Sequence, residues 1–170
     1  IYIGFPGTTL ANMADRYPLY ILDGIVSGLD LPGGWLHNAL RGHQLVYEVD
    51  VFSWLGLESG YFCIYAATQP DKVHTVVDMI LQNMEKAKAG QISDEELDNT
   101  KQMALVTARL HRQGNDQMAS DMALNELYGL GYDFSDHEAE QIAKVTKADV
   151  QRVAQLYLHH PAIMITTPSP

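Results

Sequence analysis

Apolar residues along the first part of the chain follow two different spacings. Residues 1–5 are mostly β-branched or aromatic and Pro6-Gly7 follows them, which predicts a short strand that ends in a turn. Over 17–29 the apolar positions recur every three or four residues, as on one face of a helix. The sequence DLPGG at 30–34 breaks that helix, and a short helix is predicted over 35–40, where Gly42 stops the pattern.

Two strands are predicted next. Between 45 and 52 apolar residues alternate with Glu48 and Asp50, as on a strand with one buried face. Residues 61–67 are apolar on both faces, which predicts a central strand of the sheet. The turn sequence GLESG at 56–60 joins the two strands into a hairpin.

The rest of the chain is predicted to be mostly helical, up to a closing strand over 162–167. Helix starts are indicated by side chains that can accept hydrogen bonds from the first backbone amides of a helix. The candidate starts are Asp71, Ser93 with Glu96, Asn115, Ser135 with Glu138, and Thr146 with Asp149.

This order of elements predicts an α+β fold. Because the strands are grouped and two of them form a hairpin, we expect a largely antiparallel β-sheet with helices packed on one face. A length of 170 residues suits one domain, so we expect residues 1–170 to form a single domain. The chain starts at Ile1 without a methionine, and we therefore expect it to be a fragment of a longer chain.

Charge and composition exclude several classes of function. A formal net charge of −10 argues against nucleic-acid binding, which needs a basic surface to displace counterions. No run of apolar residues is long enough to span a membrane. Cys63 is the only cysteine, so an internal disulfide is excluded.

No complete set of catalytic or metal-binding residues is visible in the sequence. The zinc motif HxxEH and the serine-nucleophile motif GxSxG are both absent. His37 and His43 lie six residues apart with a helix stop between them, a spacing that does not place both on one helical face. We therefore expect no catalytic residue, metal ligand or cofactor in this chain alone.

Arg41 and Tyr47 are the remaining candidates for chemistry. Arg41 closes the predicted short helix, and its guanidinium offers a fork of donors to a carbonyl or carboxylate. Tyr47 lies in the next strand, and its hydroxyl can donate to developing negative charge. The alternatives are that Arg41 caps helix carbonyls and that Tyr47, which alternates with Leu45 and Val49, belongs to the core.

Several segments in order resemble the non-catalytic, C-terminal domain of the M16 metallopeptidase family, the group of pitrilysin, insulinase and the mitochondrial processing peptidase. The segments are IYIGFPGTT, YPLYILDGIVSG, LPGGWLHNALRGHQLVYEV, ATQPDKVHTVVDMILQNMEKAKAGQISDEELDNTKQ, VTKADVQRVAQLYL and ITTPSP. The resemblance covers nearly the whole chain. It implies the M16 peptidase-like fold, which is also called the LuxS/MPP-like metallohydrolase fold.

The resemblance also implies a divided active site. In the family a half with HxxEH binds zinc, and an inactive half supplies an arginine and a tyrosine to the peptide substrate. By this resemblance Arg41 would hold a substrate carbonyl and Tyr47 would help to stabilise the tetrahedral oxyanion. Five residues separate the two here, whereas many members have six.

The resemblance leaves two functions open. In the first, the chain is the substrate-binding half of a zinc metalloendopeptidase, with the zinc-bearing catalytic domain in the same or a separate chain. In the second, it is a proteolytically inactive scaffold or interaction domain, for which a homodimer is also an option. The compartment is left open among periplasm, cytoplasm and organellar matrix.

Overall fold

The computed structural model describes residues 1–29, 31 and 33–167. Asp30 and Pro32, in the predicted break at 30–34, and residues 168–170 of the closing segment lie outside the described part. In chain order the elements are β1 (Tyr2–Gly7), α1 (Met13–Ser27), α2 (Gly34–Leu36), the π-helical segment η1 (His37–Arg41), β2 (Glu48–Trp54), β3 (Gly60–Ala67), the 3₁₀ turn η2 (Pro70–Lys72), α3 (Val73–Lys88), α4 (Asp94–His111), α5 (Asn115–Leu127), the 3₁₀ turn η3 (Phe134–His137), α6 (Glu138–Lys144), α7 (Lys147–Tyr157) and β4 (Ala162–Met164).

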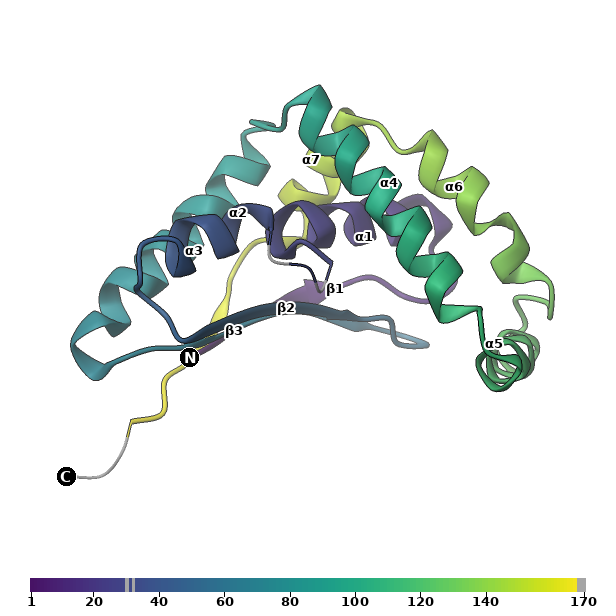
Figure 1. The fold of residues 1–170 in the computed structure, drawn as a ribbon, viewed down its shortest axis with the longest axis horizontal. Helices are drawn as coiled ribbons and strands as arrows, with labels where there is room; N and C mark the ends of the chain where they lie inside the picture. The colour runs from purple at the N-terminus through teal and green to yellow at the C-terminus, as the bar shows by residue number, and fades with distance from the viewer. Residues whose placement is uncertain (30, 32, 168–170) are drawn as a thin grey trace.

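The four strands form one antiparallel sheet in the order β2-β3-β1-β4. The predicted hairpin is β2–β3, and β3 is a central strand as the sequence indicates. The labelled helices other than α5 lie on one side of this sheet, and α5 lies beyond its end (Figure 1). The predicted α+β class, with a largely antiparallel sheet and helices on one face, is confirmed.

The two faces of the sheet differ in what covers them. The inner face carries fully or nearly fully buried residues, which are Ile3, Phe5, Val51, Phe62, Ile64 and Ala66. Above it, α1 packs against β2 on one side and against α4 and α7 on the other (Figure 1). The opposite face exposes aromatic side chains, of which Trp54 is 61% and Tyr61 is 45% exposed. Alternation along each strand thus separates a helix-covered core from an open aromatic surface.

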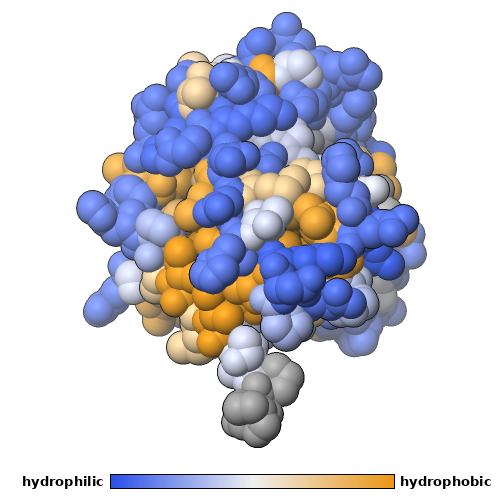
Figure 2. All heavy atoms as spheres, turned by 90° about the vertical axis from the view of Figure 1, so that its left-hand side faces the viewer, coloured by the Kyte–Doolittle hydropathy of each residue, from blue (hydrophilic) through white to orange (hydrophobic). Residues whose placement is uncertain are grey.

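Apolar side chains also reach the surface near the C-terminal segment. Figure 2 shows apolar residues gathered above that segment, on the side of the molecule that holds both chain ends in Figure 1. Met164 of β4 is 66% exposed and the following Ile165 is 44% exposed. The closing strand is shorter than the predicted range of 162–167, since β4 ends at Met164.

Two of the predicted helix starts are confirmed by complete capping boxes. The Ser93 and Thr146 hydroxyls accept hydrogen bonds from the Glu96 and Asp149 amides, and the Glu96 and Asp149 carboxylates accept in return from the Ser93 and Thr146 amides. Asn115 is the first residue of α5, as predicted.

The predicted starts at Asp71 and at Ser135 with Glu138 are wrong. Asp71 lies inside the 3₁₀ turn that Pro70 opens, so α3 begins after Lys72 and no side chain caps it. Ser135 lies inside η3, and its hydroxyl oxygen accepts a hydrogen bond from Asn125 of α5 instead of from α6. Helices α3 and α6 each follow directly on a 3₁₀ turn. The turn already has near-helical backbone geometry, so the helix begins without a side-chain cap.

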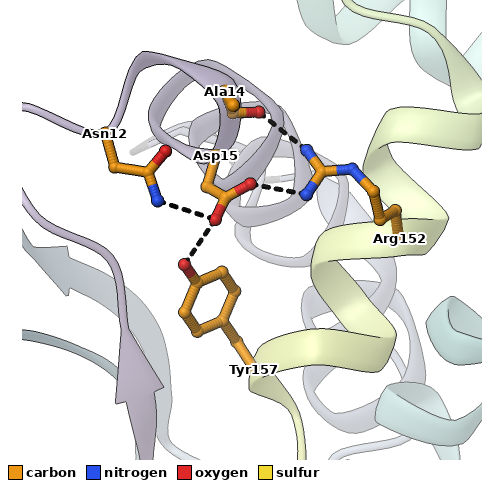
Figure 3. Close-up of polar contacts among 5 residues, drawn as sticks. All are labelled: Asn12, Ala14, Asp15, Arg152 and Tyr157. Atoms are coloured by element: carbon orange, nitrogen blue, oxygen red, sulfur yellow. Dashed lines mark hydrogen bonds and ion pairs between the residues drawn. The ribbon is translucent and has the colours of Figure 1, made fainter.

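A buried carboxylate joins the start of α1 to α7 (Figure 3). Asp15 accepts hydrogen bonds from Tyr157 at 2.6 Å, Arg152 at 2.6 Å and Asn12 at 2.9 Å, and Arg152 also donates to the Ala14 carbonyl at 2.7 Å. Burial opposes ionisation of Asp15, but the hydrogen bonds from Tyr157, Arg152 and Asn12 outweigh it and hold the pKa below its ordinary value. The ionised carboxylate therefore fastens the two helices that flank the core.

Among the described residues, no helix is both long and apolar enough to cross a membrane.

Candidate functional site

The segment from Gly33 to Gly42, which we call the arm, begins against the end of α1. Gly34 has a φ of 71°, a left-handed conformation that side chains other than glycine rarely adopt. A Cβ at Gly34 would also lie 2.6 Å from the backbone nitrogen of Gly28 and from the backbone carbon of Ser27. The arm can therefore approach the α1 backbone this closely only because residue 34 has no side chain.

The middle of the arm is a short helix that changes from α to π geometry. Leu36 and Leu40 are fully buried and anchor its inner face in the core. In the π-helical part, the Gly42 amide bonds to the His37 carbonyl at 3.1 Å, and the Leu45 amide continues this spacing with the Leu40 carbonyl at 2.9 Å. The predicted helix over 35–40 and its stop at Gly42 are confirmed, and the wide turn is typical of functional sites.

Arg41 is the last residue of this helix and lies exposed at its end. Its guanidinium forms no hydrogen bond or ion pair with another described residue. The interpretation in which Arg41 caps helix carbonyls thus finds no supporting contact in the described part of the chain. The exposed guanidinium thus offers its five N–H donors to solvent.

Tyr47 is exposed rather than part of the core. Its side chain is 66% exposed, and its hydroxyl oxygen accepts a hydrogen bond from the Gln69 side chain at 2.9 Å. The core interpretation is wrong because β2 begins only at Glu48, so the alternation that joins Leu45, Tyr47 and Val49 does not run along a continuous strand. The buried residue of this connection is Val46.

The connection between Arg41 and Tyr47 is tied to the segment that follows β3. Thr68 donates its hydroxyl to the Leu45 carbonyl at 2.6 Å, and Lys72 donates to the Gln44 carbonyl at 3.2 Å. The Tyr47 amide bonds to the Ala67 carbonyl at 2.8 Å. Arg41 and Tyr47 thus lie at the two ends of one connection, the junction between the end of the arm and the start of β2, which these bonds hold against the segment after β3.

Gln69 and Lys72 were not singled out in the sequence. The hairpin pairs Glu48 with Ala67, so the residues after Ala67 must neighbour those before Glu48. An antiparallel register extended by two residues pairs Tyr47 with Thr68 and Val46 with Gln69, which places Gln69 next to Tyr47.

The histidines of this region do not gather into a metal site. His43 is exposed, and its ring Nδ1 lies 3.0 Å from the Ala39 carbonyl of the same helical segment. Within residues 1–29, 31 and 33–167, no three His, Cys, Asp or Glu side chains are grouped so that they could hold a metal ion.

A cavity of about 470 Å³ lies at the other end of β2, between α1, α4 and α5. It is lined by charged groups of both signs, including Arg16, Arg112, Asp121 and Glu138. Burial raises the pKa of Glu138, although Arg16 opposes the rise. Because its walls carry charges of both signs, this cavity does not single out a ligand, and no arm residue lines it, so it is separate from the Arg41 junction.

Comparison with known proteins connects this geometry to a family. Residues 1–104 match the family model described as the peptidase M16 inactive domain. None of the curated proteins compared with the sequence matches it.

Three solved structures are similar to the chain over almost its whole length. An inactive peptidase domain from Bordetella parapertussis is 20% identical with a TM-score of 0.82, and the match covers 99% of this chain and 93% of that one. A protease from Helicobacter pylori is 18% identical with a TM-score of 0.81, covering 92% of this chain and 38% of the protease. A chain of complex III2 from Candida albicans, solved with Inz-5 bound, is 16% identical with a TM-score of 0.78, covering 92% of this chain and 39% of that one. At these identities the likeness shows the fold alone, and this chain spans well under half of the Helicobacter protease.

Proposed function

This chain belongs to the family of M16 peptidase inactive domains, and we propose that it is the peptide-binding, non-catalytic half of a zinc metalloendopeptidase. In this role it pairs with a zinc-bearing catalytic half, in the same or a separate chain. The observation that carries the proposal is the junction of Arg41 and Tyr47, two exposed hydrogen-bond donors at the end of a firmly packed arm.

Arg41 suits the backbone of a peptide substrate. A guanidinium without a partner in the described protein can direct its donor fork at a peptide carbonyl. Because Leu36 and Leu40 bury the inner face of the helix that carries it, only the Arg41 side chain itself must be ordered when the peptide binds.

Tyr47 suits the developing charge of the reaction. Its hydroxyl oxygen already accepts a hydrogen bond from Gln69, so the hydroxyl hydrogen is left to donate to an external acceptor. A donor aimed at the oxyanion of a tetrahedral intermediate stabilises the transition state more than the ground state. Gln69 is thus part of the proposed site, since it orients the Tyr47 hydroxyl.

Zinc belongs to the catalytic half in this proposal. The described residues of this chain offer no group of three metal-binding side chains, so they do not fit the metal. When bound in the other half, zinc supplies an activated water molecule for peptide hydrolysis. This chain contributes binding and charge stabilisation.

Kinetics of the paired halves test the proposal. Replacing Arg41 with alanine or Tyr47 with phenylalanine is expected to lower kcat/KM for peptide cleavage by about 10- to 1000-fold, the range for losing one charged or oxyanion hydrogen bond. Neither change removes a buried group, so the free energy of unfolding is expected to stay within about 0.5 kcal/mol of the wild-type value.

Arg109→Ala and Tyr132→Phe are matched controls. Both residues are exposed and lie outside the junction, and Tyr132 is 62% exposed. The controls are expected to cleave peptide at the wild-type rate. If Arg41→Ala and Tyr47→Phe also do so, the chain is a scaffold or interaction domain and the proposed role is wrong.

A further inference from the structure

Trp35 connects the start of the arm to two helices that come later in the chain. Its indole Nε1 donates a hydrogen bond of 2.6 Å to Glu96 in the first turn of α4. The ammonium of Lys86, in the last turn of α3, lies 3.6 Å from the centroid of the indole ring. The side chain is 7% exposed, so these contacts form where solvent screens them little.

Glu96 is held in place independently of Trp35. Its second carboxylate oxygen accepts hydrogen bonds from the Ser93 amide at 2.8 Å and from the Ser93 hydroxyl at 2.9 Å. The capping box that starts α4 therefore fixes one carboxylate oxygen and leaves the other to accept from Trp35. A carboxylate fixed in this way is a directional anchor, because its free oxygen can accept the indole proton over a narrow range of angles.

The other contacts of the arm do not set its direction in the same way. Leu36 and Leu40 bury apolar surface, an interaction that tolerates rotation of the helix about its axis. Gly34 determines how closely the arm approaches α1. The hydrogen bond from Trp35 to Glu96 is a directional side-chain contact at the first turn of the helix whose last residue is Arg41.

We propose that Trp35 is a positioning residue for Arg41: with Glu96 and Lys86 it fixes the rotation of the arm and so the direction in which the guanidinium meets the peptide. This inference rests on the proposed function of Arg41. It adds that the start of α4, far from Arg41 in sequence, is coupled to peptide binding through the indole ring.

Hydrogen exchange tests the positioning without any substrate. Trp35→Phe keeps an aromatic ring but removes the donor to Glu96. The amides of Gly42, at the end of the arm, and of Leu45, just after it, bond to the His37 and Leu40 carbonyls of the arm and are expected to exchange about 10-fold faster. Trp54→Phe is the matched control, since Trp54 is 61% exposed on the open sheet face, and it is expected to leave these amides unchanged. Unchanged arm exchange in Trp35→Phe, or acceleration spread equally over the whole chain, would overturn the proposal.

A double-mutant cycle tests whether Trp35 acts through Arg41. In the paired halves Trp35→Phe alone is expected to lower kcat/KM by about 10-fold, because small misplacement of a binding group is costly. In the Arg41→Ala background the same change is expected to have no further effect. If Trp35→Phe lowers kcat/KM by the same factor with and without Arg41, the two residues are not coupled and Trp35 has only a structural role.

The two proposals fail separately. If Arg41→Ala alone does not change cleavage, the proposed function fails, whereas the exchange experiment still decides whether Trp35 orders the arm. Should Trp35→Phe not fold, Glu96→Ala takes its place, because alanine leaves no side-chain acceptor for the Trp35 indole or for Ser93. Ser93→Ala, which weakens the same cap but leaves the acceptor for Trp35, is its control and is expected to keep wild-type exchange in the arm.

Discussion

Gly34 lies where the arm meets the end of α1, and its backbone conformation excludes other residues. The φ of 71° is costly for any residue with a Cβ, and the added atom would lie 2.6 Å from the α1 backbone. Gly42 at the other end of the arm is similarly confined, since a Cβ there would lie 2.5 Å from the Asn38 carbonyl oxygen. These two glycines delimit the segment that carries Arg41.

Gly34→Ala is expected to lower the free energy of unfolding by about 2–4 kcal/mol, through the left-handed conformation together with the overlap on α1. Gly129→Ala separates the two causes, because Gly129 has a φ of 73° but nothing within 4 Å of its added Cβ. That variant is expected to lose only about 1 kcal/mol. Urea denaturation of both proteins measures the difference, and equal losses would show that the close approach to α1 contributes nothing.

Asp15 makes the free energy of unfolding depend on pH. Its folded pKa lies below the ordinary value of 3.8, so its contribution is fully present above that pH and is lost as pH falls through the folded pKa. Asp15→Asn leaves Arg152 without its anionic partner and is expected to cost about 2–4 kcal/mol at neutral pH. The gap in unfolding free energy between wild type and variant should narrow below about pH 4. A gap that stays constant down to acid pH would contradict this account. Glu58→Gln, at an exposed carboxylate in the turn between β2 and β3, is the control expected to show no such gap.

Single residues were only partly predictable. Arg41 was correctly expected at the end of a short helix, because glycine stops and apolar spacing are local signals. The exposure of Tyr47 was not predictable from its neighbours, since it depends on where β2 starts and that is decided by pairing with β3. The Trp35–Glu96 bond joins residues 61 positions apart, which leaves no trace in local spacing.

At the scale of elements, helix starts were predicted well where a capping box exists and poorly where a helix follows a 3₁₀ turn. The boxes at Ser93 and Thr146 couple two polar side chains to the backbone within four residues, so the sequence shows them directly. The π-helical segment that ends in Arg41 was not predictable, because one wide turn of five residues leaves no distinct spacing of apolar positions in the sequence.

Thr146→Ala and Asp71→Ala compare a residue that caps a helix with a residue that was predicted to cap one but does not. Thr146 accepts from the Asp149 amide, so its loss is expected to cost about 1 kcal/mol of unfolding free energy. Asp71 caps no helix and its replacement is expected to change stability by less than about 0.5 kcal/mol. Thermal or chemical denaturation checks both values, and a larger loss for Asp71→Ala would restore it as the start of α3.

In the proposed function, the whole chain is the non-catalytic half of a peptidase. Grouped strands and a hairpin were enough to predict the antiparallel sheet and the helices on one side. That the other face of β3 is open was not predictable from its composition, because Tyr61, Cys63 and Tyr65 are as apolar or aromatic as the buried residues between them. In the proposed function the active site is divided at the same scale: this chain would present hydrogen-bond donors to the peptide, and its described residues group no metal ligands.

Peptide cleavage by the two halves, separate and mixed, tests the central claim most directly. In the proposed function the other half carries HxxEH, and we expect it to be encoded in the same gene or in an adjacent reading frame. We predict that neither half alone cleaves peptide, that the mixture does, and that metal analysis finds zinc only in the HxxEH half. Cleavage by this chain alone, zinc bound to it through several of its own side chains, or full activity of the HxxEH half without it would contradict the account.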